Sequence, residues 1–513
     1  MATKYYITTP LYYVNAKPHI GHAYTNILCD TFARFHRLKD EDVFFMTGTD
    51  EHGTKIAKAA KDQGMEPKAY ADQMIPHFES LWKLLGIQYD FFFRTTSQMH
   101  RGAVQQILKD LEAKGDIYKS KYVGWYSVKS ETFYSESELV DGKCPDTGGE
   151  VQRIEEENYF FKMSKYRDWL IDYIQKTPGF IQPDMRRNEI LGFLKQPLED
   201  LCITRPRERL SWGIPYPGSD EYVIYVWFDA LVNYVSGVGY ARDAEQFKKW
   251  WPADVHVIGK DILRHHAVYW PIMLKACGIE MPKKILAHGW WTLSGAKVSK
   301  SSGNVVDPVG LSEKYGVDAF RYFLLNEVTL GLDGAYSEDL IRERYRTDLA
   351  NDLGNLWFRT ASMIDRYFGG KIPKPGPDTG SDALLSDAKA LFSPVREAME
   401  TYNPRDALGL IWKVVKRANQ YVEENKPWQL AKQESGKQKL ADVLFVLADT
   451  LAHMACLLQP FLPGTAQKIL TRLQLKSPLA AKSKSDFEQM FVKNDVSIER
   501  GDALFPKLED EAA

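Results

Sequence analysis

The chain has 513 residues, 44% of them hydrophobic and 26% charged, which is ordinary for a globular protein and suggests about three domains. A net charge of −2 excludes a global basic field, so any contact with RNA would have to be a local patch. The five scattered cysteines favour a reducing compartment. The first predicted strand begins too early to leave room for a signal peptide, so we expect a cytoplasmic protein.

The chain begins with a predicted strand, loop and helix. Tyr5–Ile7 has the aromatic and β-branched composition of a buried strand. From Ile20 the apolar residues recur three or four apart, as on one helix face. His19 and His22 would then share a face at the helix N-terminus, where exposed N–H groups attract phosphate and favour neutral imidazoles. Gly21, without a Cβ, would let a flat ligand approach the backbone, so the unit predicts a nucleotide site.

The next stretch alternates strand and helix, as a parallel-sheet domain does. Asp42–Thr47 is a second predicted strand, and Gly48–Thr54 is a predicted polar loop at its carboxyl end, where open α/β sheets bind ligands. Helical patterns continue to about Lys114. Between residues 116 and 217 short strands alternate with Gly-, Asp- and Ser-rich turns, which indicates an insertion into the sheet domain.

The parallel pattern resumes in three predicted strands: Tyr222–Trp227, Val255–Gly259 and Ile285–His288. From about residue 311 the pattern is helical, and its most apolar window, Val443–Leu458, is interrupted by polar residues, as in a core helix of a bundle. We predict an α/β Rossmann-like parallel-sheet domain with an inserted connective subdomain, followed by an all-α bundle. The expected segments are 1–115 and 218–310 for the two sheet halves, 116–217 for the insertion, 311–350 for a linker region, and 351–513 for the bundle.

Two short motifs become specific only together. His19–His22 reads H-I-G-H, and Lys297–Ser301 reads K-V-S-K-S in a cationic loop. Each follows a predicted strand, in this order, with an insertion between the sheet halves. The chain thereby resembles the class I aminoacyl-tRNA synthetases, whose signatures are H-I-G-H and K-M-S-K-S. Val298 replaces the Met of the second signature and preserves an apolar residue against adenine.

Further motifs are similar to those of methionyl-tRNA synthetases: Thr9–Asn15, Gly48–Gly53, Ser211–Pro215, Val226–Leu231, Gly259–Ile262 and Lys426–Trp428. The resemblance implies that methionine and ATP, with Mg²⁺, form methionyl-adenylate and pyrophosphate, and that the methionyl group then passes to the 3′ end of tRNA. It implies that His19 and His22 hold the triphosphate and that Lys297 and Lys300 neutralise the departing pyrophosphate. The residues implied for ATP are His19, Gly21, His22, Gly259, Asp261, His288, Gly289, Trp290, Lys297, Val298 and Lys300.

The resemblance also implies a methionine pocket, made of Leu11, Tyr13, Asp50, Trp227, Ala230, Tyr234 and His266. Asp50 can pair with the substrate ammonium, and Tyr13 and Trp227 offer rings to the thioether, a contact worth about 0.3–1.5 kcal/mol. Taken alone, Trp227 would be interpreted as a core aromatic of a strand. At position 265 the chain has His where the family has an aromatic residue.

The predicted insertion lacks most ligands of the zinc knuckle that many family members carry. The matching positions are Ser127, Ser130, Cys144 and Thr147. A closed zinc site needs four nitrogen or sulfur ligands, and a single thiol does not supply them. We therefore predict that the protein contains no structural zinc.

The resemblance implies that the linker, residues 311–350, contacts the tRNA stem. The helical part carries the residues that the resemblance assigns to the CAU anticodon of tRNA(Met). Asn355 and Arg359, four apart, share a helix face, and Trp428 matches an aromatic that stacks on an anticodon base. The alternatives are that Asn355 and Arg359 belong to a solvated polar face and that Trp428 is a core residue. Stacking on an unpaired base is worth roughly 1–3 kcal/mol, which favours the RNA role. We expect no C-terminal domain of OB-fold type and therefore a monomer. We also expect no membrane contact.

Three alternatives remain open at this stage. Another class I synthetase, for leucine, isoleucine, valine or cysteine, is the nearest, although those for branched aliphatics usually carry a longer insertion. A non-catalytic RNA-binding relative is disfavoured because the motif histidines and lysines are present. A small-molecule adenylyltransferase is disfavoured by the long helical C-terminal part.

Overall fold

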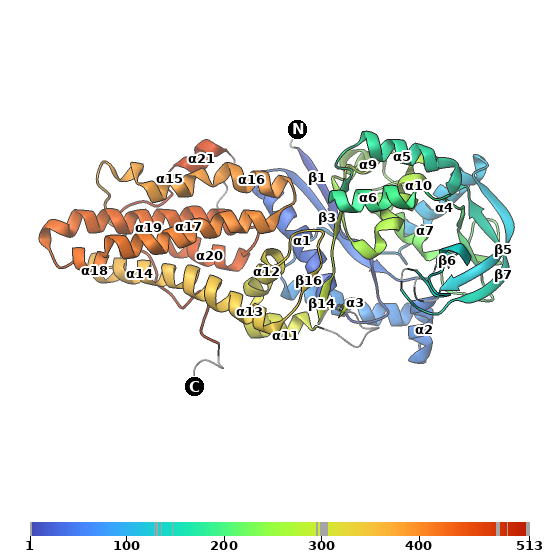
Figure 1. The fold of residues 1–513 in the computed structure, drawn as a ribbon, viewed down its shortest axis with the longest axis horizontal. Coiled ribbons are helices and arrows are strands. Elements are labelled where there is room, and N and C mark those ends of the chain that lie inside the picture. The colour runs from blue at the N-terminus through green and yellow to red at the C-terminus, as the bar shows by residue number, and fades with distance from the viewer. Residues whose placement is uncertain are drawn as a thin grey trace.

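The structure, a computed structural model, has a parallel sheet at its centre, a helical bundle at one end and a connective subdomain at the other (Figure 1). It describes residues 3–127, 129, 132–134, 136–145, 147–293, 296–297, 306–478, 483–489 and 491–508. The predicted class, an α/β sheet domain followed by a helical bundle, is confirmed.

The central sheet has seven strands, and all the pairings between them are parallel. Their order is β2 (Tyr12–Tyr13), β3 (Asp42–Asp50), β1 (Lys4–Thr8), β12 (Val255–Gly259), β13 (Ile285–His288) and β8 (Ile181–Gln182), and β4 (Phe91–Arg94) also pairs with β3. The chain leaves β1 on one side for β3 and returns on the other side as β12. The strand order reverses at this point, where open sheets bind ligands at the carboxyl ends of their strands.

Helix α1 (Ile20–Leu38) follows β2 and packs on the sheet through apolar residues at helical spacing, among them Ile20, Tyr24 and Ile27, which are buried. The predicted loop after β3 is shorter than expected, because β3 continues to Asp50 and α2 begins at Thr54. The remaining helices of this half are α2 (Thr54–Asp62), α3 (Pro67–Leu84) and α4 (Gln98–Ala113).

The connective subdomain is built on a four-stranded antiparallel sheet, as its short strand patterns predict. Its strands, in spatial order, are β6 (Thr132–Tyr134), β5 (Ile117–Ser127), β7 (Gln152–Phe161) and β9 (Leu201–Cys202). Helices α5 (Arg167–Lys176) and α6 (Asp184–Phe193) flank β8, so residues within 116–217 also contribute a strand to the central sheet. The expected domain boundaries stay predictions.

One predicted strand is wrong. Tyr222–Trp227 was expected in the parallel sheet, but β11 (Tyr222–Ile224) pairs antiparallel with β10 (Thr204–Pro206), and Val226 already begins α7 (Val226–Leu231). A short, wholly apolar run fits a buried strand and a buried helix equally well, and tertiary packing decides between them. The chain continues through α8 (Asn233–Ser236) and α9 (Ala244–Trp250) to β12, and a π-helical turn, His265–Tyr269, leads into α10 (Trp270–Cys277).

Beyond β13, a small sheet places β14 (Trp291–Leu293) between β15 (Ala296–Lys297) and β16 (Gly334–Ala335). The helices around it are α11 (Pro308–Tyr315), α12 (Val317–Asn326) and α13 (Glu338–Arg344), followed by a π-helical segment, Tyr345–Gly354. The bundle comprises α14 (Asn355–Phe368), α15 (Ala383–Ala390), α16 (Phe392–Glu400), α17 (Pro404–Asn425), α18 (Pro427–Leu430), α19 (Lys437–Leu458), α20 (Pro463–Arg472) and α21 (Lys484–Glu488).

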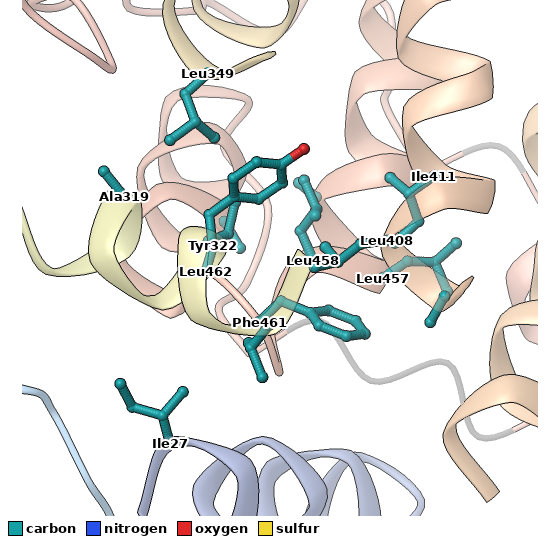
Figure 2. Packing of buried hydrophobic residues seen from close by; sticks show 14 of the residues in the cluster. Ile27, Ala319, Tyr322, Leu349, Leu408, Ile411, Leu457, Leu458, Phe461 and Leu462 are labelled. Carbon is teal, nitrogen blue, oxygen red and sulfur yellow. The ribbon is translucent and has the colours of Figure 1, made fainter. Parts of the chain in front are cut away.

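The core of the bundle is continuous with the core under the sheet. Figure 2 shows Ile27 of α1 on one side of Phe461, with Tyr322 of α12 and the bundle residues Leu408 and Ile411 of α17 on the other sides. Among the described residues, Glu434–Leu458 is the one helical segment long and apolar enough to cross a membrane, and 89% of its most apolar window is buried. That burial is typical of a core helix, as the sequence predicts.

Candidate active site

Two histidines close the N-terminus of α1. His19 is the N-cap residue, and its Nδ1 accepts a hydrogen bond from the Gly21 N–H at 3.0 Å. His22 lies three residues further on, and its Nδ1 accepts from the His19 N–H at 3.1 Å. This reciprocal arrangement is a capping box, with imidazoles in place of the usual hydroxyl and carboxylate. The two rings stack with centroids 3.9 Å apart, so the predicted shared face is present.

The capping bonds fix which nitrogen of each imidazole carries the proton. Because Nδ1 of His19 and of His22 accepts a backbone proton, the neutral ring carries its hydrogen on Nε2. Each ring therefore presents an Nε2–H donor at a helix end that already favours anions. Gly21 has a second role besides the predicted one, because a Cβ there would lie 2.9 Å from the His19 ring and displace the cap.

The residues expected around methionine lie beside this cap. Tyr13 of β2 and Asp50 of β3 are directly paired in the sheet, and Asp50 is buried. The Tyr13 ring meets the Trp227 ring of α7 edge to face at 6.3 Å. Leu11 and Trp227 are partly buried against the same core, and Ala230 is buried there. Three segments far apart in sequence thus bring the residues expected around methionine together.

The floor of the pocket is a cluster of buried, neutral histidines. Tyr234 O–H lies 2.7 Å from His266 Nε2, while His266 Nδ1 lies 2.9 Å from the Ile262 carbonyl. Nδ1 therefore donates to the carbonyl, and Nε2 accepts from the tyrosine. Burial lowers the pKa of His266 to about 4 and the pKa of His256 and His265 well below the usual range. None of these imidazoles carries a charge at neutral pH.

His265 is the edge of the pocket at which the chain departs from the expected pattern. It stacks on Trp227 with ring centroids 3.8 Å apart and so replaces the expected aromatic in shape. Within the part of the chain that the structure describes, neither ring nitrogen of His265 nor Trp227 Nε1 has a hydrogen-bond partner. Buried polar atoms are almost always paired, so these three unpaired nitrogens mark this edge as a candidate ligand site. The π-helical turn that carries His265 and His266 is a frequent feature of functional sites.

The residues expected around ATP meet at the ends of β12 and β13. His288 Nε2 lies 2.8 Å from the Thr25 hydroxyl of α1 and its ring lies edge-on to Tyr24, so β13 and the histidine helix are joined here. A Cβ at position 259 would lie 2.6 Å from Asp261 Oδ1, so glycine there leaves room for this carboxylate. Asp261 Oδ1 accepts a hydrogen bond from Trp290 Nε1 at 3.1 Å. Gly289 passes so close to the backbone of Leu332 that a side chain would collide with it.

The lysine loop lies mostly outside the described residues. The backbone of Lys297 pairs with Thr292 in the small sheet, which places the start of the loop beside β14. Val298 and Lys300 are not among the described residues, so the expected meeting of these lysines with the histidines stays a prediction. The expected roles of Lys297 and Lys300 rest on the motif alone.

The structure describes three of the four positions that match the zinc knuckle of other family members. Ser127 and Cys144 are buried, Thr147 is half-buried, and Ser130 is outside the described residues. Where the structure describes the chain, it contains no group of three or more His, Cys, Asp or Glu residues placed to hold a metal. The prediction that the protein lacks structural zinc awaits metal analysis.

On the bundle, the residues expected at the anticodon lie together. Asn355 is exposed at the start of α14, and Arg359 follows one turn later on the same face. The Arg359 guanidinium lies 5.7 Å from the centre of the half-buried Trp428 ring and donates to Glu423 at 2.7 Å. Part of the Trp428 side chain is therefore accessible, as a stacking role requires.

Comparison with known proteins is decisive. The profile "tRNA synthetases class I (M)" matches residues 5–156 and 147–361, and "Anticodon binding domain of methionyl tRNA ligase" matches residues 372–513. The chain belongs to the methionyl-tRNA synthetase family. The predicted recognition and enzyme class, an aminoacyl-tRNA ligase of class I, are confirmed.

Relatives in the methionyl-tRNA synthetase family match along the whole chain. The methionine--tRNA ligase of Caldanaerobacter subterraneus subsp. tengcongensis is 48% identical over 100% of this chain and 80% of its own length. That of Thermotoga maritima is 43% identical, over 99% and 80%. The structure of Mycobacterium tuberculosis methionyl-tRNA synthetase with methionyl-adenylate has a TM-score of 0.94 at 42% identity, over 98% of this chain and 100% of that one. The free form of that enzyme gives 0.87 at 39% identity, over 99% and 98%.

Sequence motifs did not single out the polar residues that lie behind the expected methionine and ATP residues. Asp229 contacts His52 and His100, and Asp333 accepts from Lys260 at 2.6 Å and from the Trp290 N–H at 2.9 Å. Asp229 lies within a motif that was recognised, between Trp227 and Ala230, and that position was an available signal. His100 and Asp333 have no local signal, because their partners lie far away in sequence.

Proposed function

We propose that this chain activates L-methionine with ATP to methionyl-adenylate, releases pyrophosphate, and transfers the methionyl group to the 3′ end of tRNA(Met). The observation that carries the proposal is the adjacency of two sites at the carboxyl ends of β1, β2 and β3. His22 lies 4.7 Å, ring to ring, from Tyr12, and Tyr13, the next residue, borders the methionine pocket beside Asp50. The proposed phosphate-binding helix end and the proposed amino-acid pocket are thus connected by the short segment between β2 and α1.

In this proposal the protein acts mainly by position and charge. Asp50 pairs with the substrate ammonium, while the neutral imidazoles and aromatic rings accept the thioether. The carboxylate of methionine is then held in line with the α-phosphorus of the Mg²⁺–ATP complex, whose phosphates bind the Nε2–H groups of His19 and His22. Lys297 and Lys300 offset the charge of the leaving pyrophosphate, and a lysine loop that tightens only in the transition state would raise the rate of the chemical step.

The proposal extends to the RNA. We assign recognition of the CAU anticodon to Asn355 and Arg359 of α14 and to Trp428 of α18, two helices of the bundle (Figure 1). Arg359 and Trp428 together offer a cation and a ring for an unstacked base. We further propose that the protein works as a monomer in the cytoplasm.

Amino-acid-dependent pyrophosphate exchange, run over a panel of amino acids with and without tRNA, tests the proposal. Exchange should require methionine and should not require tRNA, and aminoacylation should require a tRNA with a CAU anticodon. Exchange that depends on leucine, isoleucine, valine or cysteine would identify a different synthetase. If Lys300→Ala leaves methionine-dependent exchange unchanged, the assignment of the lysine loop is wrong.

A further inference from the structure

A buried carboxylate lies directly behind the methionine pocket. Asp229 is 0% exposed and sits on α7 between Trp227 and Ala230, two residues of the pocket wall. Burial opposes its ionisation, but its contacts with His52 and His100 outweigh burial and lower its pKa to about 2. A negative charge is therefore buried within two residues of the amino-acid site at neutral pH.

Two histidines satisfy this carboxylate completely. Asp229 Oδ2 lies 2.6 Å from His52 Nδ1, and Oδ1 lies 2.6 Å from His100 Nε2. An ionised carboxylate only accepts hydrogen bonds, so each imidazole must present an N–H to it. The second nitrogen of His100, Nδ1, lies 2.9 Å from the Ser236 hydroxyl of α8. The network joins the end of β3, helix α4 and the α7–α8 segment.

The network connects the two walls that the substrate must touch at once. His52 follows Asp50, the proposed partner of the ammonium group, by two residues, and Asp229 follows Trp227 by two residues. The residue between Asp50 and His52 is also locked, because buried Glu51 accepts two hydrogen bonds from Arg94. The backbone next to Asp50 is therefore held by two contacts: the Glu51–Arg94 ion pair and the hydrogen bond from His52 to Asp229 of α7.

We propose that Asp229 is a positioning residue that sets the distance between the ammonium-binding wall at Asp50 and the aromatic wall at Trp227. The inference rests on the proposed methionine pocket. A buried ionic network is rarely the most stabilising way to fill a core, since apolar residues of similar volume are often as stable. Hydrogen bonds of fixed length and direction do, however, specify one separation of two segments, which apolar packing specifies less sharply.

The role predicts an effect on methionine that is absent for ATP. Asp229→Asn removes the negative charge and leaves one acceptor where the carboxylate has two, so one histidine must change its tautomer or lose its contact. Measured by pyrophosphate exchange, the KM for methionine should rise about tenfold while the KM for ATP changes by less than about twofold. A merely structural role would raise both constants together and would overturn the proposal, as would an unchanged KM for methionine.

A matched control is available in the same domain. Asp30 is also 0% exposed and bonds Arg34 and Arg321, on the side of α1 that faces the bundle. Asp30→Asn removes an equally buried carboxylate but should leave the KM for methionine unchanged. If it raises that KM as much as Asp229→Asn does, the effect is a general loss of stability and the proposal fails.

A second pair of variants tests the path through His52 and does not require Asp229→Asn to fold. His52→Gln keeps an N–H donor for Asp229, whereas His52→Leu does not. The KM for methionine should rise in the Leu variant and be largely restored in the Gln variant. Equal constants in the two variants would contradict the path.

Asp50→Asn separates this inference from the proposed function. It removes the charge that should bind the ammonium group directly. If Asp50→Asn leaves the KM for methionine unchanged, the methionine pocket itself is wrongly assigned. If Asp50→Asn raises it while Asp229→Asn does not, the pocket stands and only the positioning role of Asp229 is refuted.

Discussion

The capping box at His19 and His22 allows the structural and chemical roles of the two histidines to be measured apart. Both imidazoles use Nδ1 to cap α1, and both present Nε2–H to the proposed phosphates. Asn is as good an N-cap residue as any, and Gln at the third position closes a capping box. The double variant His19→Asn, His22→Gln should therefore keep the helix end intact but lose both imidazole donors. The double alanine variant should lose the cap and the donors together.

The two effects differ in size and in the assay that detects them. Loss of a cap costs about 0.5–2 kcal/mol of stability, so only the alanine variant should unfold at a lower temperature or urea concentration. Loss of one donor aimed at developing charge costs about 10²–10³ in kcat, so both double variants should lose at least that much in pyrophosphate exchange. Thermal unfolding and exchange at saturating methionine and ATP give the two readouts from one preparation.

The double variant His19→Asn, His22→Gln distinguishes the capping role of the two imidazoles from their phosphate-binding role. If its exchange rate matches that of the wild type, the imidazoles act only as caps and phosphate binding must come from the backbone N–H groups. If it unfolds as early as the alanine variant, the capping bonds do not stabilise α1 and the tautomer argument loses its basis. Neither result is expected, because the two rings stack at 3.9 Å with their capping bonds already formed.

Three further outcomes follow from the same geometry. Trp428→Ala should raise the KM for tRNA about tenfold or more and spare pyrophosphate exchange, and equal damage to both reactions would favour a core role. Tyr234→Phe leaves His266 Nε2 without its 2.7 Å partner, so the KM for methionine should rise about tenfold. An unchanged KM would show that this hydrogen bond does not contribute to methionine binding. Burial lowers the pKa of His266 to about 4 against about 6.5 when unfolded, so the unfolded state binds more protons between these values. Lowering the pH from 7 to 5 should therefore destabilise the fold by roughly 2 kcal/mol through this residue, and urea unfolding should show a smaller change in His266→Gln.

The sequence was most informative where function and local structure depend on the same few residues. The change from strand to helical periodicity located β1 and α1 and placed His19 and His22 at a helix end, as the structure has them. It did not reveal that the imidazoles are the cap, because histidine is not a usual capping residue. The parallel strands β12 and β13 were found in the same way, from short apolar runs that end in Gly or His.

Sequence patterns failed where long-range packing decides the local structure. The run after Tyr222 was predicted as a single strand but divides into β11 and α7, and the two-residue β8 lies in a region that was expected to be a separate insertion. The Asp229 network could not be predicted either, because its partners lie 177 and 129 residues away. A motif shows which residues occur together, but the contacts that hold them appear only when the sheet is assembled.

Tyr12, which belongs to neither expected binding set, joins the strand of the proposed methionine pocket to the histidine helix. Side chains alternate along a strand, so Tyr12 and Tyr13 of β2 face opposite ways, Tyr13 toward the amino-acid pocket and Tyr12 into the core. The Tyr12 hydroxyl accepts from Asn26 of α1 at 2.8 Å, and its ring contacts His22 at 4.7 Å and Trp82 at 5.9 Å. A buried ring held by these three contacts adopts few rotamers, so the proposed pocket wall and the histidine helix are fixed relative to each other before either substrate binds. In a reaction in which the protein supplies little covalent chemistry, that fixed separation is itself a main source of rate, because the entropy of alignment is lost on folding instead of in the transition state.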